Sequence, residues 1–285
     1  MLSTPLSIIA ASGFGRRHDA PLVDSAGRAF DLDERFFEVF QNRVRRASRY
    51  VKFANLAAHQ CLAQLDLAYL KSQRLGFFLG TGLGNTPDIV NFTSEIFTQI
   101  NATISPANFV NSVSNAGLFY VARNLGTECT TSVVSQETLS FEAALLSAGL
   151  MLARGEVDLA LVGGVDVLHP PLETAYLRLG SKGASRDNLG EGSAFVALTL
   201  SNAKERARLT HVGLQHCAFT EDTGKESVAY GIDHPLEAGS YRHQCGDYST
   251  GSAFALTQFV SAARRNPWWH VNQHAEGLTG FFRVQ

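Results

Sequence analysis

Short apolar runs alternate along the chain with stretches of helical periodicity. Residues 6–11 are an apolar run that ends at Gly13, which predicts a buried strand entering a turn. Residues 33–70 place apolar side chains at three- and four-residue spacing, as amphipathic helices do. Residues 77–79 form a second apolar run. This alternation of strands and helices predicts an α/β fold.

The middle of the chain predicts a parallel crossover. The β-branched residues 130–134 predict a strand, Ser135 is placed to cap a helix that ends at Arg154-Gly155, and residues 158–162 form a continuous apolar strand. A strand, a helix and a strand in this order form a right-handed parallel unit. We therefore expect a mostly parallel sheet with helices on both faces.

The C-terminal third is less regular. Residues 220–244 are polar and rich in turn residues, so we expect a long irregular loop there. Residues 252–265 have helical periodicity, and residues 268–285 predict a closing pair of strands that turn at Glu276-Gly277. No internal repeat is apparent, although a duplicated half could lie below recognition.

The segment Gly80-Thr-Gly-Leu-Gly84 invites comparison with nucleotide-binding loops. Its third glycine falls one residue early for the dinucleotide fingerprint, and no Lys-Ser/Thr pair ends a phosphate loop. A tight turn where two chain segments pass closely explains these glycines more simply. We therefore expect no nucleotide cofactor.

Composition and charge exclude several classes of partner. Of 285 residues, 24 are basic and 26 acidic, and the net charge of −2 argues against a nucleic-acid surface. The four cysteines are scattered without a CxxC pair and predict reduced thiols. No apolar run could span a membrane and the first residues lack a secretory signature, so we expect a cytoplasmic protein. His270 and His274 would share a strand face, but without a third ligand we expect no metal site and no cofactor.

Four segments, in their order along the chain, resemble the ketosynthase family of condensing enzymes. Phe77–Gly84 resembles the family's strand and glycine turn, and Asn111–Gly117 resembles its interface helix. Arg154–Gly164 resembles the strand behind the active site, and Gly190–Gly192 resembles the GEG turn. The resemblance implies a thiolase-like fold, a layered α/β architecture with mostly parallel sheets and a truncated C-terminal half. The ketosynthase-like half would cover residues 1–208 and the shortened half residues 209–285.

The resemblance also indicates a missing nucleophile. Active ketosynthases carry a cysteine at the turn between the strand and the helix of residues 130–152, where a helix N-terminus favours the thiolate. This chain has Ser135, Gln136, Glu137 and Thr138 there, a degenerate region in which we expect no catalytic residue. Cys129 lies several residues too early. The spacing to Gly155 places Thr138 at the cysteine position unless the helix start carries two extra residues, in which case Gln136 takes it.

Active family members also stabilise the enolate and the oxyanion with two histidines. One follows a strand in an HGT turn and the other precedes a GAAG turn, and neither motif is present. The first would fall within residues 220–244, and the second position is near Cys245. His234 and His243 stay open as a displaced pair, although loop histidines are mostly solvated or bonded locally.

Chain-length factors of type II polyketide synthases resemble ketosynthases in this same way, with the fold retained and the catalytic residues lost. This sequence looks most like their shortened aryl-polyene branch, through Ser105–Phe109, Ser112–Asn115 and Ser140-Phe141. The resemblance implies a non-catalytic subunit that heterodimerises with an active beta-ketoacyl synthase. An acyl carrier protein with its bound polyketide or polyene chain would be the second partner.

The same resemblance implies where the partner binds. The interface would be formed by residues 130–134 and 108–125, and the growing chain would extend from the partner's cysteine into a tunnel along it. The expected tunnel and interface residues are Phe109, Ser112, Asn115, Ala116, Phe119, Tyr120, Ser132 and Val134. Aromatic residues at helical spacing are, however, also typical of plain core.

Two catalytic alternatives stay open. A glutamine at the nucleophile position of some ketosynthase relatives supports malonyl decarboxylation, so Gln136 raises the alternative of a malonyl-carrier-protein decarboxylase, which would still need the missing histidines. The other alternative is a divergent active beta-ketoacyl synthase with relocated groups, or a hydrolase that uses Ser135. A serine nucleophile would need an adjacent general base.

Overall fold

The computed structural model describes residues 1–2, 4–41, 44, 47–98, 105–179, 184–201, 203–221, 223–224, 226–262, 266–274 and 276–285. The strands are β1 (Leu6–Arg17), β2 (Leu22–Asp24), β3 (Ala29–Phe30), β4 (Leu75–Gly80), β5 (Cys129–Val134), β6 (Leu159–Asp166), β7 (Gly190–Thr199), β8 (Ala207–Gln215), β9 (Ser227–Tyr230), β10 (Trp268–Gln273) and β11 (Thr279–Val284). The α-helices are α1 (Leu32–Phe40), α2 (Arg49–Leu62), α3 (Leu67–Lys71), α4 (Thr86–Thr98), α5 (Pro106–Ser112), α6 (Ala116–Leu125), α7 (Ser140–Ala153), α8 (Leu172–Leu179), α9 (Arg242–Cys245) and α10 (Gly251–Ser261). The 3₁₀ helices are η1 (Glu137–Leu139) and η2 (Arg186–Asn188).

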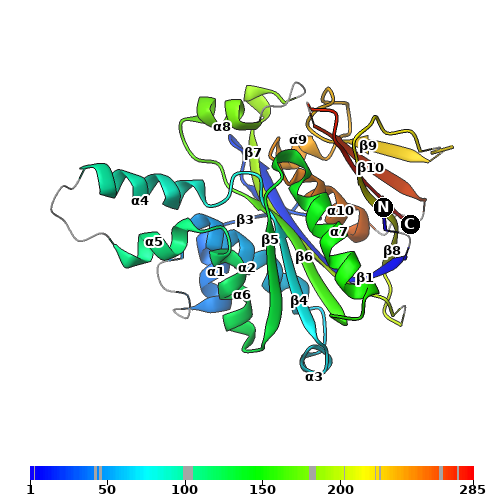
Figure 1. Cartoon of the computed structure of the whole chain (residues 1–285). Helices are drawn as coiled ribbons and strands as arrows, with labels where there is room; N and C mark the ends of the chain where they lie inside the picture. Colours follow the sequence, from blue (N-terminus) through cyan, green and yellow to red (C-terminus); the bar gives the residue numbers. More distant parts are fainter. Residues whose placement is uncertain are drawn as a thin grey trace.

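The strands form one mixed sheet (Figure 1). Its order is β5-β4-β6-β7-β1-β8-β11-β10-β9, and β2 and β3 extend from β1 as a hairpin. Strands β5, β4 and β6 are parallel, because α7 returns the chain from the end of β5 to the start of β6. The crossover predicted for residues 130–162 is therefore confirmed. β7 and β1 continue the sheet in antiparallel pairing.

The two ends of the sheet repeat one arrangement. Parallel β4 and β6 are followed by antiparallel β7 and β1, and parallel β9 and β10 are followed by antiparallel β11 and β8. The two copies meet where β1 pairs antiparallel with β8, with Ser7 opposite Arg208. A duplicated half is thus present without a recognisable sequence repeat. Among the residues described, the second copy has no counterpart of β5, so β9 is an edge strand.

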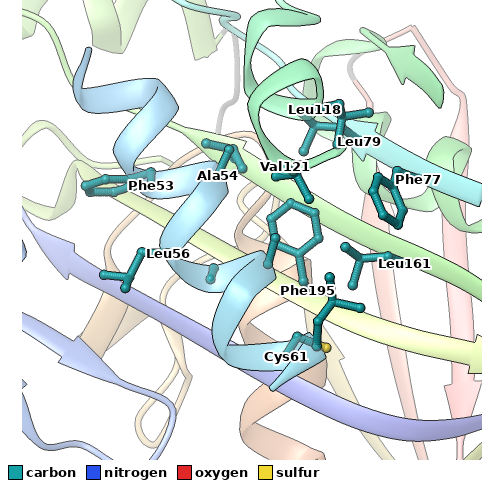
Figure 2. Packing of buried hydrophobic residues seen from close by; sticks show 14 of the residues in the cluster. Phe53, Ala54, Leu56, Cys61, Phe77, Leu79, Leu118, Val121, Leu161 and Phe195 are labelled. Carbon is teal, nitrogen blue, oxygen red and sulfur yellow. The ribbon is translucent and has the colours of Figure 1, made fainter. Parts of the chain in front are cut away.

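One face of the first copy is covered by α2, and α6 packs beside α2. Apolar side chains of α2 and of the sheet form a single buried cluster. Figure 2 shows Phe53, Leu56 and Cys61 of α2 in this cluster with Leu161 of β6 and Phe195 of β7. The helical periodicity of residues 33–70 therefore marks the face that packs on the sheet.

The opposite face is covered by α7 and α10. Helix α7 packs against β4 and β6 of the first copy and against β8 and β11 of the second. It is buried along most of its circumference, which explains why its sequence is apolar on nearly all sides. The start of α7, where the family cysteine would lie, is therefore enclosed between the two copies.

Residues 220–244 are not one irregular loop. They contain β9, which pairs in parallel with β10, and α9 begins at Arg242. Residues 222 and 225 lie outside the described residues. A strand of four residues is too short to be distinguished from a loop by its apolar pattern, so this part of the prediction was wrong. The closing pair of strands predicted for residues 268–285 is confirmed as β10 and β11.

Helices α4 and α5, which we call the helical arm, project from the body of the molecule (Figure 1). The one buried residue of α4 is Asp88, and that of α5 is Asn111. Phe92 and Phe109 pack against each other across the arm, with ring centroids 5.6 Å apart. The arm therefore has little core of its own and leaves most of its apolar side chains exposed.

Candidate functional site

The segment between β5 and α7, which we call the elbow, contains an extra turn. β5 ends at Val134, residues 137–139 form η1, and α7 begins only at Ser140. The prediction that Ser135 caps this helix is therefore wrong, because the helix begins five residues later. Instead, the Gln136 N–H donates to Ser140 Oγ at 2.8 Å. The extra turn accounts for the ambiguity between Gln136 and Thr138, because it adds residues between the strand and the helix.

Glu137 is the most strained residue of the elbow. Its φ of 49° lies in the left-handed region, which non-glycine residues rarely adopt. Its carboxylate pairs with Nε2 of His274, in the turn between β10 and β11. The sequence placed His274 beside His270 on one strand face, but His274 lies beyond β10 and contacts the elbow. A partner 137 residues away along the chain leaves no local signal in the sequence.

The other elbow side chains differ in exposure and in their contacts. Ser135 is exposed, and within the described residues no base is hydrogen-bonded to it. Gln136 is half-buried. Thr138 is buried, and its carbonyl oxygen accepts a hydrogen bond from Asn272 Nδ2 at 2.9 Å. A hydroxyl nucleophile needs an adjacent base and access to substrate, so neither hydroxyl meets both conditions.

Five buried polar side chains lie behind the elbow, and we call them the buried polar cluster: Thr138, Glu142, Ser252, His270 and Asn272. Asn272 Nδ2 lies 3.2 Å from Glu142 Oε1, and His270 Nδ1 lies 3.7 Å from the same oxygen. Tyr241 Oη completes the group at 3.0 Å from His270 Nε2. The cluster thus joins η1 and α7 to β10 and α10.

Burial sets the charge of this cluster. Desolvation raises the pKa of Glu142 to about 7, although the Ser252 and Asn272 side chains partly offset it. Desolvation, with the Arg242 cation as a smaller cause, lowers the pKa of His270 to about 3. At neutral pH His270 is therefore uncharged and Glu142 is about half protonated.

The two histidine motifs expected from the family resemblance would fall within residues 220–244 and near Cys245, and neither motif is in the sequence. Strand β9 and the glycine after it are present, but the residue before Gly231 is Tyr230, which packs on His234 with ring centroids 4.2 Å apart. The position before the late glycine turn is Cys245, whose thiol pKa is raised by burial. His243 Nε2 contacts the Glu237 carbonyl oxygen at 3.1 Å. His234 lies close enough to His270 to be a minor cause of its lowered pKa.

A buried ion pair holds both of these turns. Arg242 Nε donates to Asp247 Oδ1 at 2.6 Å, and both side chains are fully enclosed. Arg242 Nη1 donates to the carbonyl oxygens of Gly231 at 3.2 Å and of His234 at 2.7 Å. Asn188 Nδ2 also donates to Asp247 Oδ1, at 3.0 Å. Arg242 therefore cross-links the turn after β9 to the turn after α9.

The glycine-rich segment after β4 wraps a carboxylate of its own chain. Asp166 Oδ1 accepts hydrogen bonds at 3.0 Å from Thr81 Oγ1 and from the N–H groups of Gly82 and Leu83. Its other oxygen accepts from the Thr250 N–H at 3.0 Å and from Thr250 Oγ1 at 2.8 Å. The loop therefore joins β6 to the start of α10, and the explanation by close chain passage holds.

The predicted interface residues differ in exposure. Phe109, Asn115 and Phe119 are exposed, and the side chains of the two phenylalanines rank among the large apolar groups open to solvent. The half-buried members are Ser112, Tyr120, Ser132 and Val134. Ala116 is different, because it is buried in the core beneath α6. Its side chain faces the core of its own chain, as do the other buried residues of α6.

Helix α6 and strand β5 border a groove. The groove has a volume of about 360 Å³ and is lined by Asn115 and Phe119 from α6 and by Cys129 and Thr131 from β5, among others. β5 pairs with β4 on one side only, so its outer edge is free among the described residues. The groove and the edge together form a surface suited to a partner that adds to the sheet.

The repeated strand order and the central α7 define a thiolase-like fold, the fold of condensing enzymes. The sequence matches the family model of the beta-ketoacyl synthase N-terminal domain over residues 10–197. The chain belongs to the beta-ketoacyl synthase family.

Solved structures resemble this chain at low sequence identity. The ishigamide ketosynthase/chain length factor gives a TM-score of 0.74 with 13% identity over 99% of both chains. A type II PKS acyl-carrier protein in complex with its ketosynthase bound to the hexaketide (AntDE:AntF) gives 0.73 with 12% identity over 99% of both chains. The ketosynthase ApeO in complex with its chain length factor ApeC from Xenorhabdus doucetiae gives 0.62 with 14% identity over 97% of this chain and 98% of that one. No curated protein sequence matches significantly.

Two further searches of the described residues gave no result. No helix among them is long and apolar enough to cross a membrane. No group of three or more histidine, cysteine, aspartate and glutamate side chains in the described ranges could hold a metal ion.

Proposed function

We propose that this chain is a non-catalytic chain-length factor, which heterodimerises with an active beta-ketoacyl synthase and shapes the tunnel for a polyketide or polyene carried by an acyl carrier protein. The observation that carries the proposal is the elbow. A ketosynthase fold is kept, but the elbow has no cysteine, the expected histidine motifs are missing from the sequence, and the residues in these segments make structural contacts.

The loss at these positions is consistent. Neither expected histidine motif is in the sequence, and Arg242 cross-links the turn after β9 to the turn after α9. Stabilising an enolate requires donors aimed at the developing charge, and a buried ion pair that is already satisfied cannot provide them. The same argument counts against malonyl decarboxylation through Gln136.

The exposed apolar surface supports a protein partner. Large apolar side chains exposed on the helical arm and on α6 include Ile89, Val90, Ile96, Phe97, Phe109, Val110, Val113 and Phe119. Phe119 lines the groove beside β5. A surface of this kind usually marks an interface, and obligate interfaces are the most apolar. Two of the three structures described above contain a ketosynthase with a chain length factor, which supports a ketosynthase as the partner.

Phe119 is the residue that we propose for the tunnel wall. Its ring is 53% exposed, packs at 5.3 Å from Tyr120 and lines the groove beside β5. From the strand, Cys129 and Thr131 line this groove, whereas Ser132 and Val134 alternate with them and face the opposite side of the sheet, where Phe78 packs with α7. Ala116 is buried in the core and would act only through its neighbours.

Co-expression tests the partner. The chain should co-elute with the ketosynthase encoded nearest its gene, and Phe119→Arg should abolish co-elution because it places a charge in the apolar interface. Leu200→Arg is the control, since Leu200 is 47% exposed in the turn between β7 and β8, away from the arm. Failure of the wild-type chain to co-elute, or equal loss by both variants, would contradict the proposal.

Two assays test the absence of catalysis. The isolated chain is incubated with malonyl-carrier protein, and released carbon dioxide is measured beside an active ketosynthase. We expect no release above background. Release that depends on Gln136, or acylation of Ser135 by an acyl thioester, would instead support the decarboxylase or the active-enzyme alternative.

A further inference from the structure

Each member of the buried polar cluster has one polar atom without a hydrogen-bond partner. These atoms are Thr138 Oγ1, Glu142 Oε2, Ser252 Oγ, His270 Nδ1 and Asn272 Oδ1. All five side chains are at least nine-tenths buried. Buried polar atoms are nearly always paired with protein or ordered water, because a marginally stable fold does not sustain several stranded groups in one place.

We infer that the buried polar cluster is an internal water-binding site, in which one or more water molecules bridge the elbow to β10 and α10. An internal water typically makes about three hydrogen bonds to buried polar groups that lack other partners. The five atoms include a carboxyl oxygen, an amide oxygen and two hydroxyls. Water can donate hydrogen bonds to the carboxyl and amide oxygens, and it can either donate to or accept from the two hydroxyls.

The side chains of His270, Asn272 and Ser252 lie around the Glu142 carboxyl because of their positions on their elements. His270 and Asn272 are two residues apart on β10 and therefore point to the same face of the sheet. Thr138 precedes Glu142 by four residues, about one helical turn, and Asn272 contacts both of them. The Ser252 hydroxyl, in the first turn of α10, lies close enough to the Glu142 carboxyl to lower its pKa. Glu142 is thus the centre of the site.

The site fits a neutral ligand better than a charged one. His270 is uncharged at neutral pH and Glu142 is the only acid in the cluster, so the fixed charge is between zero and minus one. The site would hold the extra turn of the elbow in place, since Thr138 in η1 is bonded through Asn272 to the strand behind it. A strained Glu137 next to it makes such anchoring necessary.

A crystal structure of the chain, alone or with its ketosynthase, tests the site directly. We expect ordered density within hydrogen-bond distance of Glu142 Oε2 and of at least one of Thr138 Oγ1, Ser252 Oγ and His270 Nδ1. An empty site, or five atoms paired directly with each other, would overturn the inference. So would density that refines as a cation with short oxygen distances.

Water relaxation dispersion tests it in solution by counting internal waters with long residence times. The Thr138→Val, Ser252→Ala double variant should lose the signal of at least one such water. Thr257→Val is the control, because Thr257 is also buried on α10 but already donates to the Phe254 carbonyl oxygen at 2.9 Å. An unchanged signal in the folded double variant, or an equal loss in the control, would refute the site. Ser252→Ala alone serves if the double variant does not fold.

Discussion

Glu142 and His270, in the buried polar cluster behind the elbow, show how burial opposes charge. Both side chains are fully enclosed and 3.7 Å apart, a geometry that would suit an ion pair. Desolvation opposes ionisation of each group, so the pKa of the acid rises and that of the base falls. At neutral pH His270 is uncharged and Glu142 is about half protonated, so the pair carries between zero and one negative charge. Their contact joins α7 of one half of the fold to β10 of the other.

The raised pKa of Glu142 makes stability depend on pH. Its folded pKa of about 7 exceeds the ordinary 4.5, so its contribution is full below pH 4.5 and is lost as the pH rises through 7. The free energy of unfolding of the wild type minus that of Glu142→Gln should therefore fall by about 3 kcal/mol between pH 4.5 and pH 8. Urea unfolding of both proteins at several pH values measures this difference. The subtraction removes the opposite contribution of His270, and a difference that does not vary with pH would contradict the assignment.

The ion pair of Arg242 and Asp247 should be essential to the fold. Arg242→Ala leaves a buried carboxylate without its counter-charge, which typically costs about 3–5 kcal/mol. Arg283→Ala is the matched control, because the Arg283–Glu226 pair is partly exposed and should cost about 1 kcal/mol. Denaturant unfolding of the two variants gives both values. Equal losses would mean that the Arg242 pair is not specially important.

At the scale of elements, the sequence was informative where burial is continuous. Residues 158–162 predicted the central strand because a strand covered on both faces is apolar throughout, and β6 is fully buried. The sequence could not predict β9, which is short and lies at the sheet edge, or η1, which depends on contacts with β10. The pairing of Glu137 with His274 was likewise hidden, because only the folded chain brings residues so distant in sequence together.

Gly80 tests how closely β4 approaches the start of α7. A Cβ atom at Gly80 would lie 2.4 Å from the Ser140 carbonyl oxygen, so Gly80→Ala must displace the strand or the helix. We expect a loss of about 1–3 kcal/mol together with chemical-shift changes in the first turn of α7.

Gly126→Ala is the control for this variant. Gly126 has a φ of 66° at the end of α6, and no atom lies within 4 Å of an added Cβ. It should cost about 1 kcal/mol through backbone strain and leave the shifts of α7 unchanged. Unchanged α7 shifts in folded Gly80→Ala would show that the contact is looser than described.

At the scale of the whole molecule, the two edges of the sheet differ in the surface that surrounds them. The fold is a duplication, yet one copy ends at β5 beside the helical arm and the other at β9. Exposed apolar side chains gather around β5 and not around β9, where the adjoining groove of about 370 Å³ is bordered by Ser227, Glu237 and Ser240 among others. An exposed edge strand flanked by apolar surface favours association, so the two edges should behave differently when a partner is present.

Hydrogen exchange can distinguish these edges in a single experiment. In the isolated chain the outward amides of both β5 and β9 should exchange quickly, because neither edge is paired among the described residues. In the heterodimer the β5 amides, and those of α5 and α6, should slow by about tenfold or more because the partner excludes water and bonds to the edge. The β9 amides serve as the internal control and should not change. Protection of β9 with β5 unaffected would place the partner at the opposite end of the sheet, and the proposed interface would then be wrong.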